Sequence, residues 1–399
     1  MNMKRRMLTA LAMLMMACMA STAQAQGETE MTKQPMEEGT PFTLRCPGAI
    51  LMEASTGQVI FEKNADEPRP VASVTKAMTI LLTLEALDEG RVDESDRVQV
   101  SEHAAGMGGS QAFLDAGSSY ALGELLKSVI IASANDAAVA LAEHLSGTEE
   151  TFVRRMNERA GELGLGQTHF VNCTGLPAQG HHMSARDVAT LSAQLDRHPR
   201  YYTYSSIWMD EIAHKGGRVT GLTNTNRLIR FYPGCDGYKT GSTNEARYCI
   251  SATAKKDGMR LIAVVLGADT SQSRFDEARA MLEYGFSGYR LVTPVQEGEA
   301  LGMSVPVRLG GSDSVSAVCG GSVSLLMRKG EEKSLSLEAA LVPAVHAPVK
   351  KGDVLGEIRI LKDGQALASV PAAAGEDVAL PGLVHALLRI RDRFMLTGR

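Results

Sequence analysis

The sequence lacks the short motifs that mark the commonest metal and nucleotide sites. None of its nine histidines are spaced as H-x-x-x-H or H-E-x-x-H, the patterns that bring two imidazoles together on a helix to bind zinc. It also contains no G-x-G-x-x-G and no P-loop, the glycine-rich turns that usually hold nucleotide phosphates. The adjacent pair His181 and His182 is interpreted as a loop feature. We therefore expect no metal site and no nucleotide cofactor.

Cysteine is scarce and scattered. Apart from Cys18 near the N-terminus, the chain has five cysteines, at positions 46, 173, 235, 249 and 319. An odd, widely spaced set without C-x-x-C does not indicate a disulfide framework. Most of these residues are expected to be small buried side chains. A bridge between Cys235 and Cys249 is left open by the sequence alone.

The N-terminus has the pattern of a secretory signal peptide. A Lys-Arg-Arg cluster at positions 4–6 precedes an apolar run over 7–20, and Ala-Gln-Ala at 23–25 fits a cleavage site. Residues 1–25 are therefore predicted to be removed on export, with a lipoprotein site at Cys18 as the less favoured alternative. Cleavage removes three positive charges and no acid, so the formal net charge changes from −5 to −8. This acidic balance argues against nucleic acid as a partner.

Hairpins and helices alternate up to about residue 290. Apolar runs flank a Ser-Thr-Gly turn in "GAILMEASTGQVIFE" (48–62) and a Lys-Asp-Gly turn within 246–268, as is typical of β-hairpins. Between them, residues 71–89 have the apolar spacing of a helix, and 120–147 indicates two helices with a break near 133–135. Antiparallel hairpins with helices between them predict an α/β (α+β) fold, not a doubly wound parallel sheet.

The character of the chain changes after about residue 290. Helical periodicity gives way to short β-like runs such as "GEIRILKDGQALASVPA", which predict a smaller all-β domain up to about residue 380. The last residues, 381–399, regain helical spacing, with apolar side chains on one face and several arginines. Such an amphipathic helix can lie on an anionic membrane surface. Packing against its own domain is the alternative.

Three short motifs carry the chemistry. Ser73 and Lys76 stand three residues apart near the start of the predicted helix, so hydroxyl and amine would be neighbours. They are followed by Ser-Ala-Asn at 133–135, at the break between two helices, and by Lys-Thr-Gly at 239–241, which leads into a strand. Each motif alone is weak, and a second S-x-N occurs at 242–244. Their order and context together form a strong signal.

These residue types suit acyl transfer by a serine. The Ser73 hydroxyl is a weak nucleophile and needs a base. Lys76 can accept its proton only when neutral, and burial beside a second cation such as Lys239 would lower its pKa from the usual value of about 10.4. The backbone N–H groups of Ser73 and Ser242 are expected to form an oxyanion hole.

The other motif residues are expected to hold the substrate. Ser133 can relay a proton to the leaving amine, and Asn135 can orient the substrate amide. Lys239 and Thr240 can bind an anionic group, such as a carboxylate. Gly241, which has no side chain, would let the strand backbone approach the substrate.

With these motifs the chain resembles the low-molecular-mass penicillin-binding proteins, and within them the D-alanyl-D-alanine carboxypeptidases. The resemblance extends over nearly the whole chain and includes "PVASVTKAMT", "IIASANDAAVALAEH", "THFVNCTGL", "HHMSARDVA", "GCDGYKTGST" and "LIAVVLGADTSQSRFDEARAMLEYGF". It implies a β-lactamase-like transpeptidase fold followed by a small all-β domain. It also implies an enzyme that removes the terminal D-alanine from peptidoglycan stem peptides through a Ser73 acyl-enzyme, is inhibited by β-lactams and needs no cofactor.

The resemblance also implies roles for individual residues. Ser73 would be the nucleophile and Lys76 the base, and Arg274, in "QSRF", would help Lys239 and Thr240 bind the terminal carboxylate. One residue departs from the family pattern: Arg247, in "EARYC", replaces a usual glycine. A bulky cation there would alter packing or add to substrate binding.

The expected organisation is a signal peptide (1–25), a catalytic domain (26–290), a β-rich domain (291–380) and an amphipathic helix (381–399). The protein is then exported and attached to the outer surface of the cytoplasmic membrane.

Three alternatives to the carboxypeptidase are considered. A serine β-lactamase shares the motifs, but the chain has no E-x-x-L-N segment, which supplies the deacylating glutamate in class A enzymes. The motifs do not separate a DD-carboxypeptidase from a DD-endopeptidase. A non-catalytic paralogue that binds cell-wall peptide is opposed by the complete set of catalytic residues.

Overall fold

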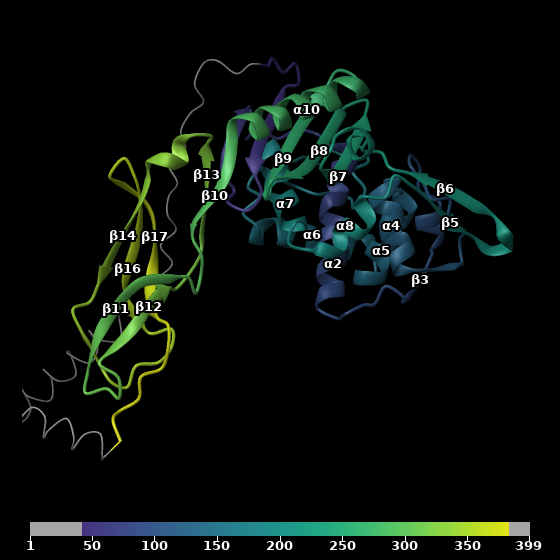
Figure 1. Ribbon diagram of the computed structural model, residues 1–399. Coiled ribbons are helices and arrows are strands. Elements are labelled where there is room, and N and C mark those ends of the chain that lie inside the picture. The colour runs from purple at the N-terminus through teal and green to yellow at the C-terminus, as the bar shows by residue number, and fades with distance from the viewer. Residues whose placement is uncertain (1–41, 383–399) are drawn as a thin grey trace, which may run out of the picture.

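The computed structural model describes residues 42–382, which form a body of helices around a sheet and a β-rich domain beyond it (Figure 1). The predicted signal peptide (1–25) lies outside the described residues. So does the predicted C-terminal helix (381–399), apart from its first two residues.

The body is built on an antiparallel sheet of five strands in the order β2-β1-β9-β8-β7. The strands are β1 (Gly48–Glu53), β2 (Val59–Lys63), β7 (Cys235–Thr243), β8 (Arg247–Lys256) and β9 (Met259–Ala268). Both predicted hairpins are present: β1 pairs with β2, and β8 pairs with β9. Since β7 ends the order, one of its edges has no strand partner within residues 42–382. The sheet is thus antiparallel, as the sequence predicts.

Both faces of the sheet are buried, and the alternation of side chains along a strand divides them between two cores. On β9, Leu261, Ala263 and Val265 face the core beneath α10 (Ser271–Gly288). Their neighbours Ile262 and Val264 face the larger core, which is shared with the remaining helices. Burial on both faces explains why β9 is a continuous apolar run.

The helices divide between the two faces of the sheet, and Figure 1 shows α10 lying along one side of β8 and β9. Small helices and two antiparallel strand pairs complete the body: α3 (Glu102–Ala105), α9 (Leu228–Phe231), η2 (Lys215–Gly217), β3 (Arg97–Gln99) with β4 (Ser119–Ala121), and β5 (Met209–Ala213) with β6 (Val219–Thr223). The larger helices away from α10 are α2 (Lys76–Asp88), α4 (Leu122–Ile131), α5 (Asn135–Ser146), α6 (Glu149–Glu162), α7 (Ala185–Leu195) and α8 (Pro199–Ser205). The predicted break within 120–147 is confirmed, because α4 ends before Ser133 and α5 begins at Asn135.

The helix predicted over 71–89 starts differently. Residues Ala72–Thr75 form a 3₁₀ turn, η1, and the α-helix begins only at Lys76. The cause lies in Ala72, whose φ of 48° is left-handed and incompatible with the first turn of an α-helix. The helix ends at the predicted place, where Gly90 adopts a φ of 68° and its N–H donates to the Leu87 carbonyl. Ser73 therefore lies on a tight turn at the mouth of α2.

The second domain is made almost entirely of strands, as predicted. They are β10 (Tyr289–Val295), β11 (Ala300–Arg308), β12 (Ser314–Cys319), β13 (Val323–Arg328), β14 (Leu335–Leu341), β15 (Val345–His346), β16 (Val354–Lys362) and β17 (Gln365–Ala374), with a 3₁₀ turn, η3 (Glu331–Ser334). β10 pairs with β13, and the other six form a sheet in the order β14-β16-β17-β12-β11-β15. Two small clusters of buried apolar residues, one around Val315 and one around Ile358, stabilise this domain. In Figure 1 this domain extends away from the end of α10.

The five cysteines of the described chain are buried free thiols. Cys235 is opposite Ala254 in the β7–β8 ladder, whereas Cys249 is opposite Gly241. The two cysteines therefore lie at different points of the ladder and do not form the bridge that the sequence left open.

Candidate active site

Ser73 and Lys76 are in direct contact at the mouth of α2. The Nζ atom of Lys76 lies 2.9 Å from the Oγ of Ser73. The lysine side chain is completely buried, while Ser73 is half-buried and open to a ligand. The predicted pairing of nucleophile and base is thus present in the geometry of the turn.

Two glycines hold the Ser73 turn between β7 and the loop before α7. A Cβ atom on Gly241 of β7 would lie 2.7 Å from the backbone N of Ser73 and 2.7 Å from the carbonyl oxygen of Val71. On the other side, a Cβ on Gly175 would lie 1.9 Å from the carbonyl oxygen of Ala72. Neither position has room for a side chain. Gly241 is therefore needed where the strand meets the backbone of Ser73, whereas the sequence predicts that it lets the strand approach the substrate.

The surroundings of Lys76 favour its neutral form. Its Nζ also lies 2.7 Å from the carbonyl oxygen of Thr174. The side chain of Asn172 holds the loop that carries this carbonyl, because it accepts hydrogen bonds from the backbone N–H groups of Thr174 and Gly175. Burial lowers the pKa of Lys76 to about 7, because water no longer solvates the ammonium ion. A substantial fraction of the amine is then unprotonated at neutral pH and free to act as a base.

The second motif presents two buried polar atoms that have no partner among residues 42–382. These are the Oγ of Ser133 and the Oδ1 of Asn135. Ser133 also has a φ of 61°, which is strained for a serine. Such unpaired atoms are rare in folded proteins and point to a binding partner that is not part of the chain.

The remaining atoms of this motif are fixed by the loop over 107–114. The Nδ2 of Asn135 donates to the carbonyl oxygen of Gly108 at 2.7 Å. The Asp136 carboxylate accepts from the backbone N–H groups of Ala112 and Leu114, both at 3.0 Å. The amide of Asn135 is thereby oriented, while its Oδ1 stays available.

The third motif brings a second buried lysine next to the first. Lys239 on β7 is 1% exposed, and its Nζ donates to the carbonyl oxygen of Thr240 at 3.1 Å. Burial, followed by the charges of Lys76 and Arg274, lowers the pKa of Lys239 well below its usual value. The sequence predicts that burial and the neighbouring cation together lower the pKa of Lys76; burial is the cause there, and Lys239 is not among the charges that act on it. Two lysines and an arginine so close together form a site that attracts an anion.

Thr240 and Ser242 lie beside this cationic group on the edge strand. The Oγ1 of Thr240 donates to the Oγ1 of Thr225 at 2.8 Å, and Ser242 is exposed. Thr225 in turn donates its backbone N–H to Ile131, at the end of α4. The loop that carries Thr225 therefore connects the third motif to the segment that carries the second.

Arg274, on α10, reaches the back of the same strand. Its Nη1 donates to the carbonyl oxygens of Gly241 at 3.0 Å and Cys249 at 3.4 Å. Its buried Nε has no acceptor in the described part of the chain. Arg274 therefore braces the β7 backbone at the nucleophile and adds positive charge beside Lys239.

Three contributors were not identified from the sequence: Thr174, Thr225 and His181. The first two act through a carbonyl and a hydroxyl on loops, which leave no pattern. His181 was assigned with His182 to an ordinary loop, yet its buried Nε2 lies 2.7 Å from the Oγ1 of Thr75, the residue before Lys76. The sequence indicates two of them, Thr174 and His181, only through the segments "THFVNCTGL" and "HHMSARDVA", which suggest no role for an individual residue.

Comparison with known proteins agrees with this site. Residues 29–270 match the family described as D-alanyl-D-alanine carboxypeptidase, and residues 289–380 match the penicillin-binding protein 5 C-terminal domain. The chain is 41% identical over 388 residues to the D-alanyl-D-alanine carboxypeptidase DacF of Bacillus subtilis, covering 97% of this chain and 98% of that protein. It is 32% identical to DacA of Escherichia coli, over 94% and 93% of the two chains.

A solved structure extends the similarity to the fold. Penicillin-binding protein 5 from Haemophilus influenzae superposes with a TM-score of 0.73 at 30% identity, covering 86% of this chain and 99% of that one. The predicted transpeptidase fold with an all-β C-terminal domain is thereby confirmed. The chain belongs to the D-alanyl-D-alanine carboxypeptidase family of serine peptidases, among the low-molecular-mass penicillin-binding proteins.

Proposed function

We propose that this enzyme removes the terminal D-alanine from peptidoglycan stem pentapeptides through an acyl-enzyme on Ser73. The observation that carries the proposal is the 2.9 Å contact between the Ser73 hydroxyl and a buried lysine amine. With its pKa lowered to about 7, Lys76 can take the hydroxyl proton as the Oγ attacks the peptide carbonyl.

The tetrahedral intermediate then collapses with cleavage of the peptide bond. The backbone N–H groups of Ser73 and Ser242 stabilise its oxyanion. Ser133 passes the proton held by Lys76 on to the departing D-alanine amine, which leaves Lys76 neutral again and accounts for a buried hydroxyl without a partner in the described chain. Attack by water on the Ser73 ester, with Lys76 again as base, releases the shortened peptide and restores the enzyme.

The substrate's charge and amide determine how it lies in the site. Its terminal carboxylate binds to Lys239 and Thr240, and Arg274 adds charge from behind the strand. The Oδ1 of Asn135 accepts from the amide of the penultimate residue, which would satisfy the second unpaired atom. The reaction needs no cofactor, because serine and lysine supply the nucleophile and the base.

The same acylation makes β-lactams covalent inhibitors. A β-lactamase would need rapid hydrolysis of that adduct, and the relatives described above are carboxypeptidases. Endopeptidase cleavage of cross-links uses the same residues and is retained as a second activity to test. A purely binding role leaves the lowered pKa of Lys76 without a purpose.

We further propose that the enzyme works outside the cytoplasm. The signal peptide over 1–25, a catalytic domain over 26–290, a β-rich domain over 291–380 and an amphipathic helix over 381–399 would place it at the outer surface of the cytoplasmic membrane. Within residues 42–382, no helix has the length and apolar character needed to cross a bilayer. Attachment would therefore depend on the C-terminal helix.

The decisive experiment combines intact-mass analysis after incubation with benzylpenicillin and an assay of D-alanine released from a stem pentapeptide. A lasting penicilloyl adduct, absent from Ser73→Ala, together with D-alanine release, is the expected result. Rapid turnover of penicillin without D-alanine release would favour the β-lactamase instead. Absence of both adduct and release would overturn the proposal.

A further inference from the structure

Arg247 has an unusual backbone at one end of the active-site strand. It is the first residue of β8 and pairs with Thr243, the last residue of β7. Its φ of 55° lies in the left-handed region, which costs an arginine energy and a glycine almost none. A strained residue of this kind suggests a function for the side chain that it presents.

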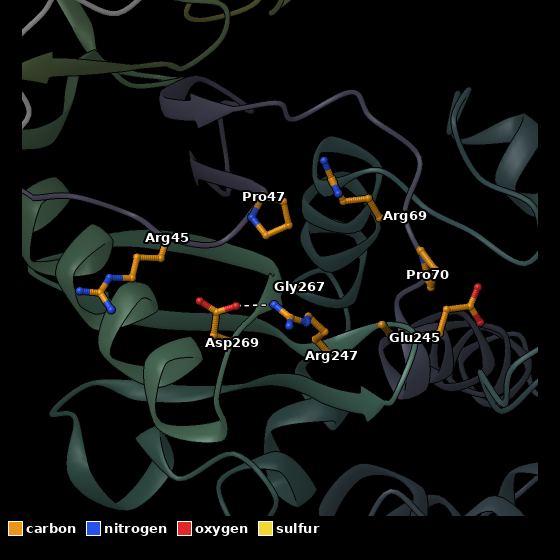
Figure 2. Close-up of a pocket in the computed structure, with 9 residues that line it drawn as sticks. Arg45, Pro47, Arg69, Pro70, Glu245, Arg247, Gly267 and Asp269 are labelled. Carbon is orange, nitrogen blue, oxygen red and sulfur yellow. Dashed lines mark hydrogen bonds and ion pairs between the residues drawn. The ribbon is translucent and has the colours of Figure 1, made fainter.

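The Arg247 side chain reaches a cavity of about 310 Å³ at this end of the sheet (Figure 2). Its wall includes Arg45, Arg69, Pro70, Glu245, Arg247 and Asp269. Three arginines and two acids give this wall a net formal charge of +1. In Figure 2 Asp269 lies between Arg45 and Arg247 and is ion-paired to Arg247. The cavity is close to the nucleophile along the chain, because Pro70 precedes Ser73 by three residues.

The direction of a bound peptide follows from the order of groups along β7, and this step depends on the proposed function. The terminal carboxylate lies at Lys239 and Thr240, and the reacting carbonyl lies at Ser242. The part of the peptide before that carbonyl must then continue toward Thr243, along the edge of β7 that has no strand partner. An extended peptide added in this way runs antiparallel to β7. Its third residue therefore arrives at the end of β7. Arg247 begins β8 on the other side of β7 from the peptide, so its long side chain must leave Asp269 and reach past the end of β7 to meet that residue.

We propose that Arg247 is a specificity residue that binds a side-chain carboxylate on the third residue of the stem peptide. A guanidinium group forms two parallel hydrogen bonds with a carboxylate, whereas it gains much less from a neutral amide. In the free enzyme Asp269 occupies that position. The side chains of Arg247 and Asp269 are 58% and 55% exposed, and exposed ion pairs are weak, so a substrate carboxylate can replace Asp269 at little cost.

The test compares D-alanine release from two pentapeptides whose third residue is meso-diaminopimelate, with its side-chain carboxyl either free or amidated. For the wild type we expect kcat/KM to be about fivefold higher with the free carboxyl, which is the upper end of what one exposed charged pair provides. Arg247→Gly, which also relieves the backbone strain, should bring the ratio close to 1. Asp269→Asn, which removes the competing carboxylate, should raise the ratio above that of the wild type.

The outcomes separate this proposal from the function on which it depends. A wild-type ratio near 1, or a ratio that Arg247→Gly leaves unchanged, overturns the role of Arg247 while the carboxypeptidase activity stands. No release from either peptide and no penicilloyl adduct would overturn both. Since Asp269→Asn must move the ratio in the opposite direction from Arg247→Gly, a general loss of folding would not imitate the expected pattern.

Discussion

The Nζ atom of Lys76 lies 2.9 Å from the Oγ of Ser73 and 2.7 Å from the carbonyl oxygen of Thr174, and none of the lysine side chain is exposed. The Thr174 carbonyl orients the amine, while burial lowers its pKa to about 7. Acylation requires the neutral amine, so kcat/KM should fall about tenfold for each pH unit below 7. The pH dependence of penicilloyl adduct formation measures this directly.

Lys76→Arg should abolish the base without removing the positive charge, because a guanidinium stays protonated at all accessible pH values. We expect acylation by benzylpenicillin to be slower by about 10²–10⁴-fold. The matched control is Lys127→Arg, at a second buried lysine, which is ion-paired with Glu124 and Asp210. If Lys76→Arg acylated as fast as Lys127→Arg, Lys76 would not be the base.

Gly241→Ala should separate the nucleophile from the edge strand. The added methyl would lie 2.7 Å from the Ser73 backbone N, and the strand or the turn must move to make room. We expect a loss of about 1–3 kcal/mol of stability and a loss of acylation of at least about 100-fold, because the oxyanion donors are displaced. Thermal unfolding and adduct formation check the two effects.

The control for this variant is Gly221→Ala, at a strand position where a Cβ meets nothing within 4 Å. It should change neither stability nor acylation appreciably. Normal acylation by Gly241→Ala would show that the close approach of β7 to Ser73 is dispensable.

Ser133→Ala should reduce activity without reducing stability. The Ser133 hydroxyl is buried and has no hydrogen-bond partner within residues 42–382, so removing it relieves a desolvation cost. We expect an unchanged or higher melting temperature and D-alanine release slower by about 10²-fold. Ser133→Gly should stabilise further, by about 1 kcal/mol, since it also relieves the left-handed backbone.

Ser192→Ala provides the comparison for that result. The Ser192 hydroxyl is equally buried but lies 2.7 Å from the Ser251 hydroxyl and donates to the Val188 carbonyl. Its loss should cost about 1 kcal/mol and leave activity intact. A destabilised Ser133→Ala protein would mean that the hydroxyl has a structural partner.

His181 should make the fold sensitive to acid. Burial lowers its pKa to about 4, whereas an unfolded histidine titrates near pH 6.5. Neutral His181 therefore contributes roughly 3 kcal/mol to the free energy of unfolding above about pH 6.5, and this contribution is lost as the pH falls toward 4. Melting temperatures measured between pH 4 and 7 should fall less steeply for His181→Gln than for the wild type. His182→Gln removes only a minor charge that lowers the same pKa and leaves the burial of His181 in place, so it should change the slope much less than His181→Gln. Equal slopes for all three proteins would contradict the prediction.

Local patterns predicted most of the fold. The hairpins at β1–β2 and β8–β9 and the break before Asn135 follow from apolar spacing and turn residues, which act over a few positions. The start of α2 was misplaced because the left-handed Ala72 is held by contacts with Gly175, which is distant in sequence. Helix propensity is a local property and contains no information about such long-range contacts.

The same distinction, between local sequence patterns and contacts of residues far apart in the sequence, applies to the candidate site. The motifs pointed to Ser73 and Lys76, whose side chains the structure brings into contact, but not to the side chains of Thr225 and His181, which lie on loops outside the motifs. The Thr174 carbonyl is 98 residues from Lys76, and a backbone oxygen has no signature in the sequence. The brace from Arg274 to the back of β7 likewise depends on how α10 packs on the sheet, which spacing cannot predict.

The lowered pKa of Lys239 has a consequence for the uptake and release of protons during turnover. Burial and the neighbouring charges lower the pKa of Lys239 in the empty site, whereas a bound carboxylate would raise it, so substrate binding should be coupled to proton uptake at a pH above the pKa of the empty site. Lys76 has the opposite requirement, since it must be free of its proton when the substrate arrives. The two neighbouring lysines therefore set opposing limits, an acid limb from Lys76 and an alkaline limb from Lys239. Binding enthalpies measured in buffers of different ionisation heat would count the protons taken up from the solvent when the substrate binds.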